Sequence, residues 1–481
     1  MDTTTWHPDL LLLFLLLLGV SVFNIVALQL NIIKTLPGFP GDLPFKLETG
    51  YVGVDELEKI QLFYYFIESE TSPENDPLVL WHTGGPGCSV LTALLYEIGP
   101  LSIDYEKSSW NSTTLKLNPY SWTKVANIIF IDAPVGTGFS YATSWEAYNN
   151  SDTISAATNY NFLRKWFKTH PEFLKNPLYI GGDSYSGIIV PIVVHEITNG
   201  NEVGVKPAMN LKGYILGNPL TSEHDDANSR VEFSHRRALI SDRLYQSIKT
   251  NCKGEYVKRD PSNVLCANDY EDLCKCLENL KAVNILENIC TSLSSSNPTE
   301  LMQWDLSSQT EDSLNFLRLV SRPPYRPQNC REDNYVYGYN WANDQTVQNA
   351  LLIRKGTVKE WLRCNGTLKR ISYAMETPSA FPYHRSYVDK GYQVIVYSGD
   401  QDLVVPYLSS QAWIEALNVT IVNDWRPWFV DRQVAGYTVQ YANKKHHVTF
   451  ATVKGAGHTA PEYNPKECFA MIDRWFAKYP I

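Results

Sequence analysis

Short runs of apolar residues recur along the chain, each bounded by residues that favour turns. Runs of this length that are rich in β-branched and aromatic residues predict buried strands. A longer segment, 151–167, places apolar side chains near helical spacing and predicts a helix. Because strands alternate with helical segments, we expect an α/β protein with a mostly parallel sheet and helices on both faces. The predicted strands cover residues 61–67, 77–82, 126–132, 178–181, 214–216, 393–397 and 448–453.

The pattern changes between about residues 221 and 327. Strand-like runs stop, polar helical segments take their place, and five of the nine cysteines lie there. Residues 292–309 are rich in Ser, Asn and Thr and predict a loop. We interpret 221–327 as a helical cap inserted into one domain that spans 29–481. Residues 37–53 are rich in Gly and Pro, and we expect a loop there as well.

The N-terminus carries an apolar run of the kind found in secretory signals. Residues 10–18 are almost all leucine, and Asn24 ends the apolar stretch. Asp2 and Asp9 stand where such signals usually have basic residues. An uncleaved membrane anchor is the alternative, but a span needs about 20 apolar residues. We therefore predict a cleaved signal peptide at 1–28 and no stable membrane insertion after its removal.

The composition narrows the possible functions. The net charge of -9 and the lack of a long Lys/Arg run argue against a nucleic-acid partner. Nine cysteines are compatible with disulfides in an oxidising compartment, although an odd number leaves at least one cysteine outside an intramolecular pair. Four N-glycosylation acceptor triplets agree with a secretory route: Asn111, Asn149, Asn365 and Asn418.

Ser184 is the candidate nucleophile. The strand at 178–181 leads into a sharp turn and then an apolar helix, which is the arrangement that exposes a strained serine at the carboxyl edge of a sheet. Small residues are needed two positions to either side, because strand and helix approach closely there. Gly182 meets this need on one side. Ser186 occupies the other side, so the usual G-x-S-x-G pattern is not literally met.

A serine hydroxyl needs a base, and the base needs a carboxylate to orient it. His458 lies in a glycine-rich loop after the last predicted strand. Asp400 and Asp402 follow the strand at 393–397, and spacing alone leaves either as the acid. The order Ser, Asp, His is that of α/β-hydrolases.

A third loop, 84–89, follows a predicted strand and is rich in glycine. Such glycines let backbone N–H groups point at a developing oxyanion. No Lys-Ser/Thr follows them, so a phosphate loop is not indicated. We predict no cofactor and no metal site.

Four motifs in order, together with LPGFPG at 36–41, resemble the serine carboxypeptidase-like family over essentially the whole mature chain. They are GGPGCS at 84–89, GGDSYSG at 181–187, YSGDQDLVVP at 397–406 and GAGHTAPEYNP at 455–465. The resemblance implies an α/β-hydrolase fold and identifies Asp402, rather than Asp400, as the acid of the triad. It also implies an oxyanion hole formed by the N–H groups of Gly85 and Tyr185.

The same resemblance implies three disulfides. They would join Cys88 to Cys330, Cys252 to Cys266, and Cys290 to Cys276 or its neighbour Cys274. Cys364 and Cys468 then have no obvious partner beyond each other.

The family contains carboxypeptidases and plant acyltransferases that use glucose esters. Its peptidases hold the substrate carboxylate with an Asn before the glycine run and a protonated Glu before the serine, where this chain has Thr83 and Asp183. Asp183 is one methylene shorter, and a missed hydrogen bond in a buried site costs roughly 1–3 kcal/mol. Thr83 offers one hydroxyl in place of an amide. We expect substrate-binding roles for Thr83, Gly84, Asp183 and Thr459.

These features predict transfer of an acyl group, expected to be aromatic, from a 1-O-β-acylglucose to an alcohol or amine in plant secondary metabolism. Carboxypeptidase activity is the alternative, and a non-catalytic binding protein is a third possibility. The expected partners are a small-molecule donor and acceptor, and their selection should depend on the insertion and on loops such as Trp425–Trp428. The resemblance implies delivery to the vacuole or outside the cell. The oligomeric state is left open.

Overall fold

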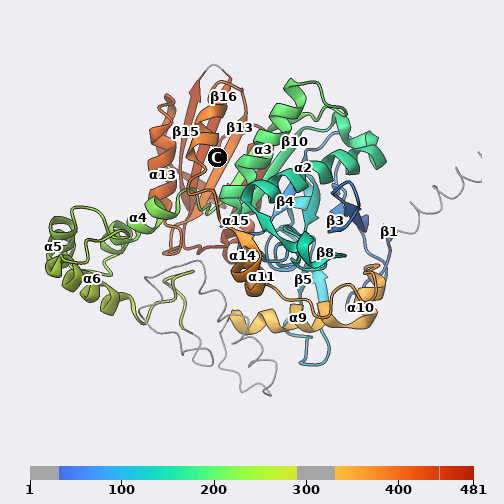
Figure 1. Ribbon diagram of the computed structural model, residues 1–481, viewed down its shortest axis with the longest axis horizontal. Helices are drawn as coiled ribbons and strands as arrows, with labels where there is room; N and C mark the ends of the chain where they lie inside the picture. Colours follow the sequence, from blue (N-terminus) through green and yellow to red (C-terminus); the bar gives the residue numbers. More distant parts are fainter. Residues whose placement is uncertain (1–31, 290–330, 444) are drawn as a thin grey trace, which may run out of the picture.

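The computed structural model describes residues 32–289, 331–443 and 445–481. Its centre is a twelve-stranded twisted sheet (Figure 1). Six neighbouring strands in the middle are parallel, as the alternating pattern predicted. In spatial order these are β7 (Asn127–Ile131), β4 (Leu78–His82), β10 (Leu178–Asp183), β11 (Leu211–Gly217), β13 (Gln393–Gly399) and β16 (His446–Val453).

Antiparallel strands extend the sheet at both ends. All seven predicted strands are present, and the remaining strands were missed by the sequence pattern. On one side lie β3 (Ile60–Ile67), β2 (Leu47–Gly53) and β1 (Ile32–Ile33), with β8 (Tyr141–Ala142) paired to β3; on the other lie β15 (Gln433–Asn443) and β14 (Ile421–Val430).

Two predicted loops are strands instead. The segment expected as a loop at 37–53 contains β2, which pairs with β3 along its whole length. Trp425–Trp428, also expected as a loop, lies within β14 at the edge of the sheet. Most of β14 is exposed, so its sequence lacks the alternation of buried and exposed residues that marks a half-buried strand.

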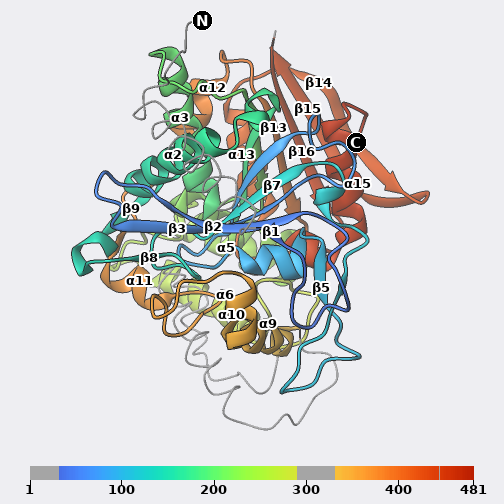
Figure 2. The same ribbon diagram turned by 90° about the vertical axis from the view of Figure 1, so that its right-hand side faces the viewer.

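Helices cover both faces of the sheet, as predicted (Figures 1 and 2). Alternate residues of each central strand point to opposite faces, so the strands contribute to two separate hydrophobic cores. One core is closed by α2 (Asp152–Thr169), α3 (Ser186–Glu202), α12 (Phe381–Tyr387) and α13 (Tyr407–Ala416). The other is closed by α9 (Tyr335–Asn343), α10 (Gln345–Ala350) and α15 (Pro465–Phe476).

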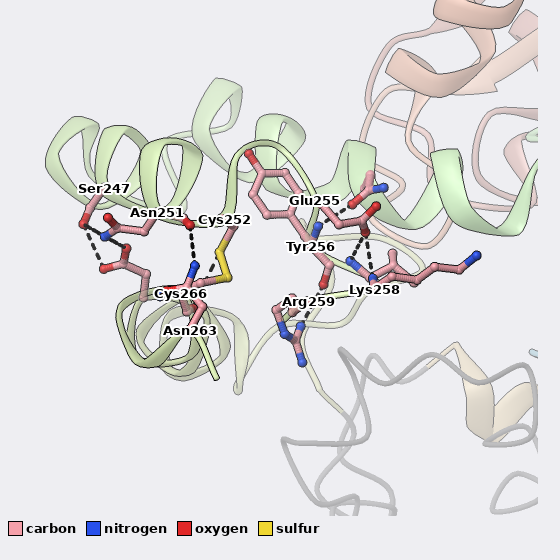
Figure 3. Close-up of a disulfide and its surroundings, with 12 residues drawn as sticks. Ser247, Asn251, Cys252, Glu255, Tyr256, Lys258, Arg259, Asn263 and Cys266 are labelled. Atoms are coloured by element: carbon pink, nitrogen blue, oxygen red, sulfur yellow. Dashed lines mark hydrogen bonds between the residues drawn. A yellow bond between two sulfur atoms is a disulfide. The ribbon is translucent and has the colours of Figure 1, made fainter. Parts of the chain in front are cut away.

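The described part of the insertion, 221–289, is helical. Its helices are α4 (Glu223–Arg236), α5 (Asp242–Cys252) and α6 (Val264–Leu277), which share a third hydrophobic cluster. A disulfide between Cys252 and Cys266 joins α5 to α6, which confirms this predicted pair (Figure 3). The remainder of the predicted insertion lies outside the described residues.

The predicted signal peptide also lies outside the described residues. Within 32–289 and 331–481, no helix has the length and apolar character needed to span a bilayer.

The acceptor triplets lie in two kinds of surroundings. Asn111, Asn149 and Asn418 are exposed. The side chain of Asn365 is partly buried, donates to the carbonyl of Gly136 at 2.9 Å and caps α11 (Gly366–Ile371). N-glycosylation remains a prediction at all four sites.

Candidate active site

Ser184 lies at the sharp turn between β10 and α3. Its φ of +56° is in the left-handed region, which is unfavourable for a residue with a side chain. Two backbone hydrogen bonds hold it there: its N–H donates to the carbonyl of Gly217 at 2.9 Å, and its carbonyl accepts the N–H of Leu220 at 2.9 Å. The sequence expectation of a strained serine between strand and helix is confirmed.

Glycines around this turn are required by close packing. A Cβ on Gly84 would lie 2.6 Å from the Cβ of Ser184, and a Cβ on Gly182 would lie 2.6 Å from that of Ser186. Ser186 therefore fits because the residue facing it has no side chain. A Cβ on Gly187 would lie 2.4 Å from the carbonyl oxygen of Leu220. The tight contact expected two positions after the nucleophile falls at Gly187 instead.

His458 connects the serine to an acid. Its Nε2 lies 2.8 Å from Oγ of Ser184, and its Nδ1 lies 2.7 Å from Oδ2 of Asp402. With Nδ1 protonated and donating to Asp402, Nε2 is free to accept the serine proton. Three loops that are distant in the sequence are thus brought together in the order that general-base activation of a serine requires.

Asp402, and not Asp400, faces the histidine. Its side chain is fully buried, and its Oδ1 accepts the N–H of Val404 at 2.8 Å. Asp400 instead accepts the N–H of Gly455 at 2.7 Å, which ties the loop of the acid to the loop of the histidine. The spacing in the sequence was compatible with either Asp400 or Asp402 as the acid of the triad. These contacts favour Asp402, the residue that the family resemblance also identifies.

Asn218 is a site residue that the sequence reasoning missed. It follows β11 with a φ of +40°, and its Nδ2 donates to Oδ2 of Asp402 at 2.9 Å. Its Oδ1 accepts the N–H of Gly399 at 3.0 Å. The only sequence signal is its place directly after a central parallel strand, where open sheets collect functional side chains.

The surroundings of His458 stabilise its charged imidazolium form more than water would. Burial lowers the pKa of His458, but the charge of Asp402 and its hydrogen bond outweigh burial, and Asp183 adds to them, so the net pKa is raised. A raised pKa strengthens the ring as a base and stabilises the imidazolium that forms when serine attacks.

The glycine loop packs directly against the serine turn. A Cβ on Gly84 would lie 2.8 Å from the backbone nitrogen of Tyr185, so nothing larger than glycine fits between them. The N–H groups of Gly85 and Tyr185 donate to no acceptor among the described residues. Both groups are therefore free to bind an oxyanion, which is the role proposed for them.

The disulfide at the glycine loop differs from the expectation. Cys88 bonds to Cys364, not to Cys330. The segment around Cys364 runs beside the glycine loop: the N–H of Asn365 donates to the carbonyl of Gly87 at 2.8 Å, which places the two sulfur atoms together. Cys364, which the sequence left without an obvious partner beyond Cys468, is thus paired with Cys88 instead.

Cys468 is buried, and no disulfide joins it to another described cysteine. No disulfide joins Cys274 or Cys276 to another described cysteine, and Cys290 and Cys330 lie outside the described residues. The pair between Cys290 and Cys274 or Cys276 therefore stays a prediction.

Asp183, next to the nucleophile, lies near a second buried acidic residue, Glu97. One oxygen of Asp183 accepts the N–H of Gly84 at 3.1 Å, whereas the two carboxylate oxygens of Glu97 are buried without a hydrogen-bond partner among the described residues. Burial raises the pKa of both groups, and repulsion from Asp183 raises that of Glu97 further. The surroundings of Glu97 therefore favour its protonated form more strongly than those of Asp183 do, and Asp183 serves as an acceptor for Gly84.

Thr83 and Thr459, the other expected substrate-binding residues, lie in different surroundings. The hydroxyl of Thr83 is buried without a hydrogen-bond partner among the described residues. That of Thr459 donates to Glu462 at 2.8 Å, and Glu462 also accepts the hydroxyl of Tyr335 at 3.0 Å. Burial raises the pKa of Glu462 as well. The sequence reasoning did not single out Glu97 or Glu462.

Among the described residues, no cluster of His, Cys, Asp or Glu has an arrangement that could hold a metal ion.

Comparison with known proteins places this site in a family. The family model for serine carboxypeptidases matches residues 37–478. Serine carboxypeptidase-like 17 of Arabidopsis thaliana is 46% identical over 449 residues, which are 93% of each chain. Serine carboxypeptidase-like 12 of the same plant is 45% identical and covers 98% of this chain and 99% of its own.

A solved structure confirms the fold. The prohormone-processing carboxypeptidase Kex1Δp of Saccharomyces cerevisiae matches 94% of this chain and 96% of its own with a TM-score of 0.71, at 19% identity. The chain has the α/β-hydrolase fold, and it belongs to the serine carboxypeptidase family of enzymes.

Proposed function

We propose that the protein is an acyltransferase that moves an acyl group from a 1-O-β-acylglucose to an alcohol or amine acceptor. Ser184 attacks the ester carbonyl while His458 takes its proton, and glucose leaves with a proton returned by the imidazolium. The acceptor then attacks the acyl-serine, His458 again acting as the base. Asp402 holds the imidazole in the required tautomer throughout. An aromatic acyl group is the expected cargo.

The state of Asp183 is the observation that carries this proposal. A carboxypeptidase needs a hydrogen-bond donor there for the free carboxylate of its substrate. Asp183 already accepts the N–H of Gly84, and the pKa of Glu97 beside it is raised more strongly than its own, so Asp183 is better suited to accept a hydrogen bond than to donate one. A second carboxylate beside it would be repelled. A glucose ester carries no such carboxylate, and its hydroxyl groups are suited to carboxylate acceptors.

Carboxypeptidase activity remains the second candidate. Burial raises the pKa of Asp183, which is the specific observation in its favour, because a protonated Asp183 would present the donor that a carboxypeptidase needs. The acidic environment of a vacuole would favour that protonation.

One experiment separates the two. The purified protein is incubated with a panel of acylglucoses plus alcohol and amine acceptors, and in parallel with a blocked dipeptide. We expect acyl products from the first mixture and no release of the terminal residue in the second. Hydrolysis of the dipeptide without acyl transfer would overturn the proposal.

A secretory route is proposed along with this function. The apolar N-terminus and the acceptor triplets support it, and the disulfides at Cys88–Cys364 and Cys252–Cys266 fit an oxidising compartment. Vacuole or extracellular space is the expected destination.

A further inference from the structure

The insertion contacts the loops of both the acid and the base through its backbone. The carbonyl of Ala282 accepts the N–H of Leu403 at 2.9 Å, and the next carbonyl, that of Val283, accepts the N–H of His458 at 2.7 Å. Ala282 of the insertion thus holds Leu403, the residue next to Asp402. The adjacent Val283 holds His458, the candidate base.

Close packing reinforces this contact. Gly457, directly before the base, has no room for a side chain, because a Cβ there would lie 2.2 Å from the carbonyl oxygen of Val283. On the other loop, the side chain of Leu403 is 5% exposed and belongs to the hydrophobic cluster of the insertion helices. The insertion and the two loops therefore form one packed unit.

Arg230 of α4 and Arg237, which caps the C-terminus of that helix, hold the loop of the acid, residues 400–404, at its two ends. Arg230 donates from Nε and Nη2 to the carbonyl oxygen of Val404, at 3.1 and 2.8 Å. Arg237 donates to the carbonyl oxygen of Asp400, and its guanidinium lies 3.6 Å from the carboxylate of that residue. Asp402 lies between these two anchors and accepts the N–H of Val404.

The burial of Arg230 indicates that its charge matters as well as its hydrogen bonds. The residue is 7% exposed, and a buried cation is costly unless acidic groups compensate it. Asp226, one turn earlier on α4, together with Asp402 and Glu223, supplies negative charge that acts on Arg230. A neutral amide would have sufficed to donate to the carbonyl of Val404.

We propose that Arg230 and Arg237 are positioning residues that fix Asp402 against His458, so that the insertion sets the geometry of the triad. The proposal rests on the triad assigned above but not on the identity of the acyl donor. The test therefore uses a reagent that needs only an activated serine.

The experiment measures how fast a fluorophosphonate labels Ser184 in the intact protein, as a function of pH, by mass spectrometry. We expect R230Q and R237Q each to slow labelling by about tenfold or more, the change produced by a loss of about one hydrogen bond to the reacting assembly. R230K should recover part of the labelling rate. Lysine keeps the positive charge, but its single nitrogen cannot replace the two nitrogens through which the planar guanidinium donates.

The midpoint of the pH profile of labelling distinguishes a positioning role from a role in folding alone, because a folding defect would not move it. The charged groups that act on His458 are Asp402, Asp183 and Arg230, and the cation lowers the pKa of the imidazole. Loss of the cation in R230Q should move the midpoint of labelling to higher pH, whereas R230K should keep it. A variant that merely folds less completely would lower the labelled fraction without moving the midpoint.

R259Q is the matched control. Arg259 belongs to the same insertion and donates to the carbonyl of Tyr256 (Figure 3). Its guanidinium stacks on Tyr270, and no hydrogen bond or ion pair among the described residues joins it to either loop. We expect R259Q to label at the parental rate. The proposal is overturned if R230Q labels within about twofold of the parent with an unmoved midpoint, or if R259Q is slowed equally. If R230Q does not fold, R237Q decides by its labelling rate alone, and a rate within about twofold of the parent overturns the proposal.

Failure of acyl transfer with normal labelling would count against the proposed function alone. Normal labelling in R230Q and R237Q would count against the positioning role alone.

Discussion

Asn218 and His458 contact the same oxygen of Asp402. Nδ2 of Asn218 lies 2.9 Å from Oδ2 of Asp402, and Nδ1 of His458 lies 2.7 Å from it. Because Oδ1 is used by the N–H of Val404, the carboxylate is held by three donors and cannot rotate without losing one. The orientation of the base is therefore fixed from the side of the acid.

Replacing Asn218 by alanine should slow the reaction without abolishing it. The change removes one donor to a buried carboxylate, which costs roughly 1.5–3 kcal/mol, or about 10–100-fold in kcat. Steady-state kinetics of acyl transfer would measure this. N218D should be slower still, because it places a second negative charge beside Asp402. Equal rates for N218D and the parent would contradict the role given to Asn218.

Replacing Ser184 by alanine should abolish acyl transfer, because no acyl-enzyme can form. Ser186, two residues later, is the matched control: its Cβ fills the space beside Gly182, and no hydrogen bond joins its hydroxyl to His458. S186A should retain most of the activity. Product analysis with an acylglucose measures both, and substantial transfer by S184A would disprove the proposed mechanism.

The rate should fall as the pH drops through the pKa of His458. Despite burial, Asp402 raises that pKa above its ordinary value of 6.5, and only the neutral ring can accept the serine proton. The acidic limb of a plot of kcat/KM against pH should therefore have its midpoint above 6.5.

D402N removes the charge that raises this pKa and also favours the wrong tautomer. We expect the midpoint to move to lower pH and the rate at the plateau to fall on the order of 10³–10⁴-fold. D400N leaves the contacts of the base unchanged and should have a far smaller effect. An unmoved midpoint in D402N would show that another group controls the profile.

Restoring the carboxypeptidase pattern should increase peptide hydrolysis. In D183E the longer side chain reaches further toward the substrate, and in T83N an amide donor replaces a hydroxyl that has no partner among the described residues. We expect the double variant T83N/D183E to release a terminal residue from a blocked dipeptide faster than the parent. The conservative variant T83S serves as the control. No gain in the double variant would weaken the argument that the missing donors exclude peptides.

Breaking the Cys88–Cys364 disulfide should destabilise the protein. The bond closes a sequence separation of 276 residues, and loss of a native disulfide typically costs about 2–5 kcal/mol. C364S should lower the midpoint of thermal unfolding and the rate of acyl transfer, because the bond anchors the glycine loop. C252S, which breaks the disulfide to Cys266 across a sequence separation of only 14 residues, is the comparison and should cost less stability. A C364S protein as stable as the parent would contradict the observed pairing.

The sequence predicted those parts of the molecule in which local pattern and tertiary environment agree. The central strands are buried on both faces, so continuous apolar runs such as 126–132 marked them well. β14 was missed because it lies exposed at the sheet edge, and β2 was missed because its glycines suggested a loop. The serine, the histidine and two candidate acids were found because glycine-rich turns after strands identify such positions.

Contacts between distant segments could not be predicted in the same way. Glu97 and Asn218 carry no local motif, and only folding brings them against Asp183 and Asp402. The partner of Cys88 was assigned incorrectly for a related reason: pairing depends on which segment runs beside the glycine loop, and several cysteines were available.

The position of the Cys88–Cys364 bond has a consequence for maturation. Should a protease cut the chain anywhere between residues 290 and 330, Ser184 would belong to one polypeptide and Asp402 and His458 to the other. The disulfide would join a cysteine before the cut to a cysteine after it, and the pairing of β11 with β13 would likewise join the two fragments. The two fragments would therefore stay together as a covalent heterodimer with a shared catalytic centre, and would migrate separately only after reduction.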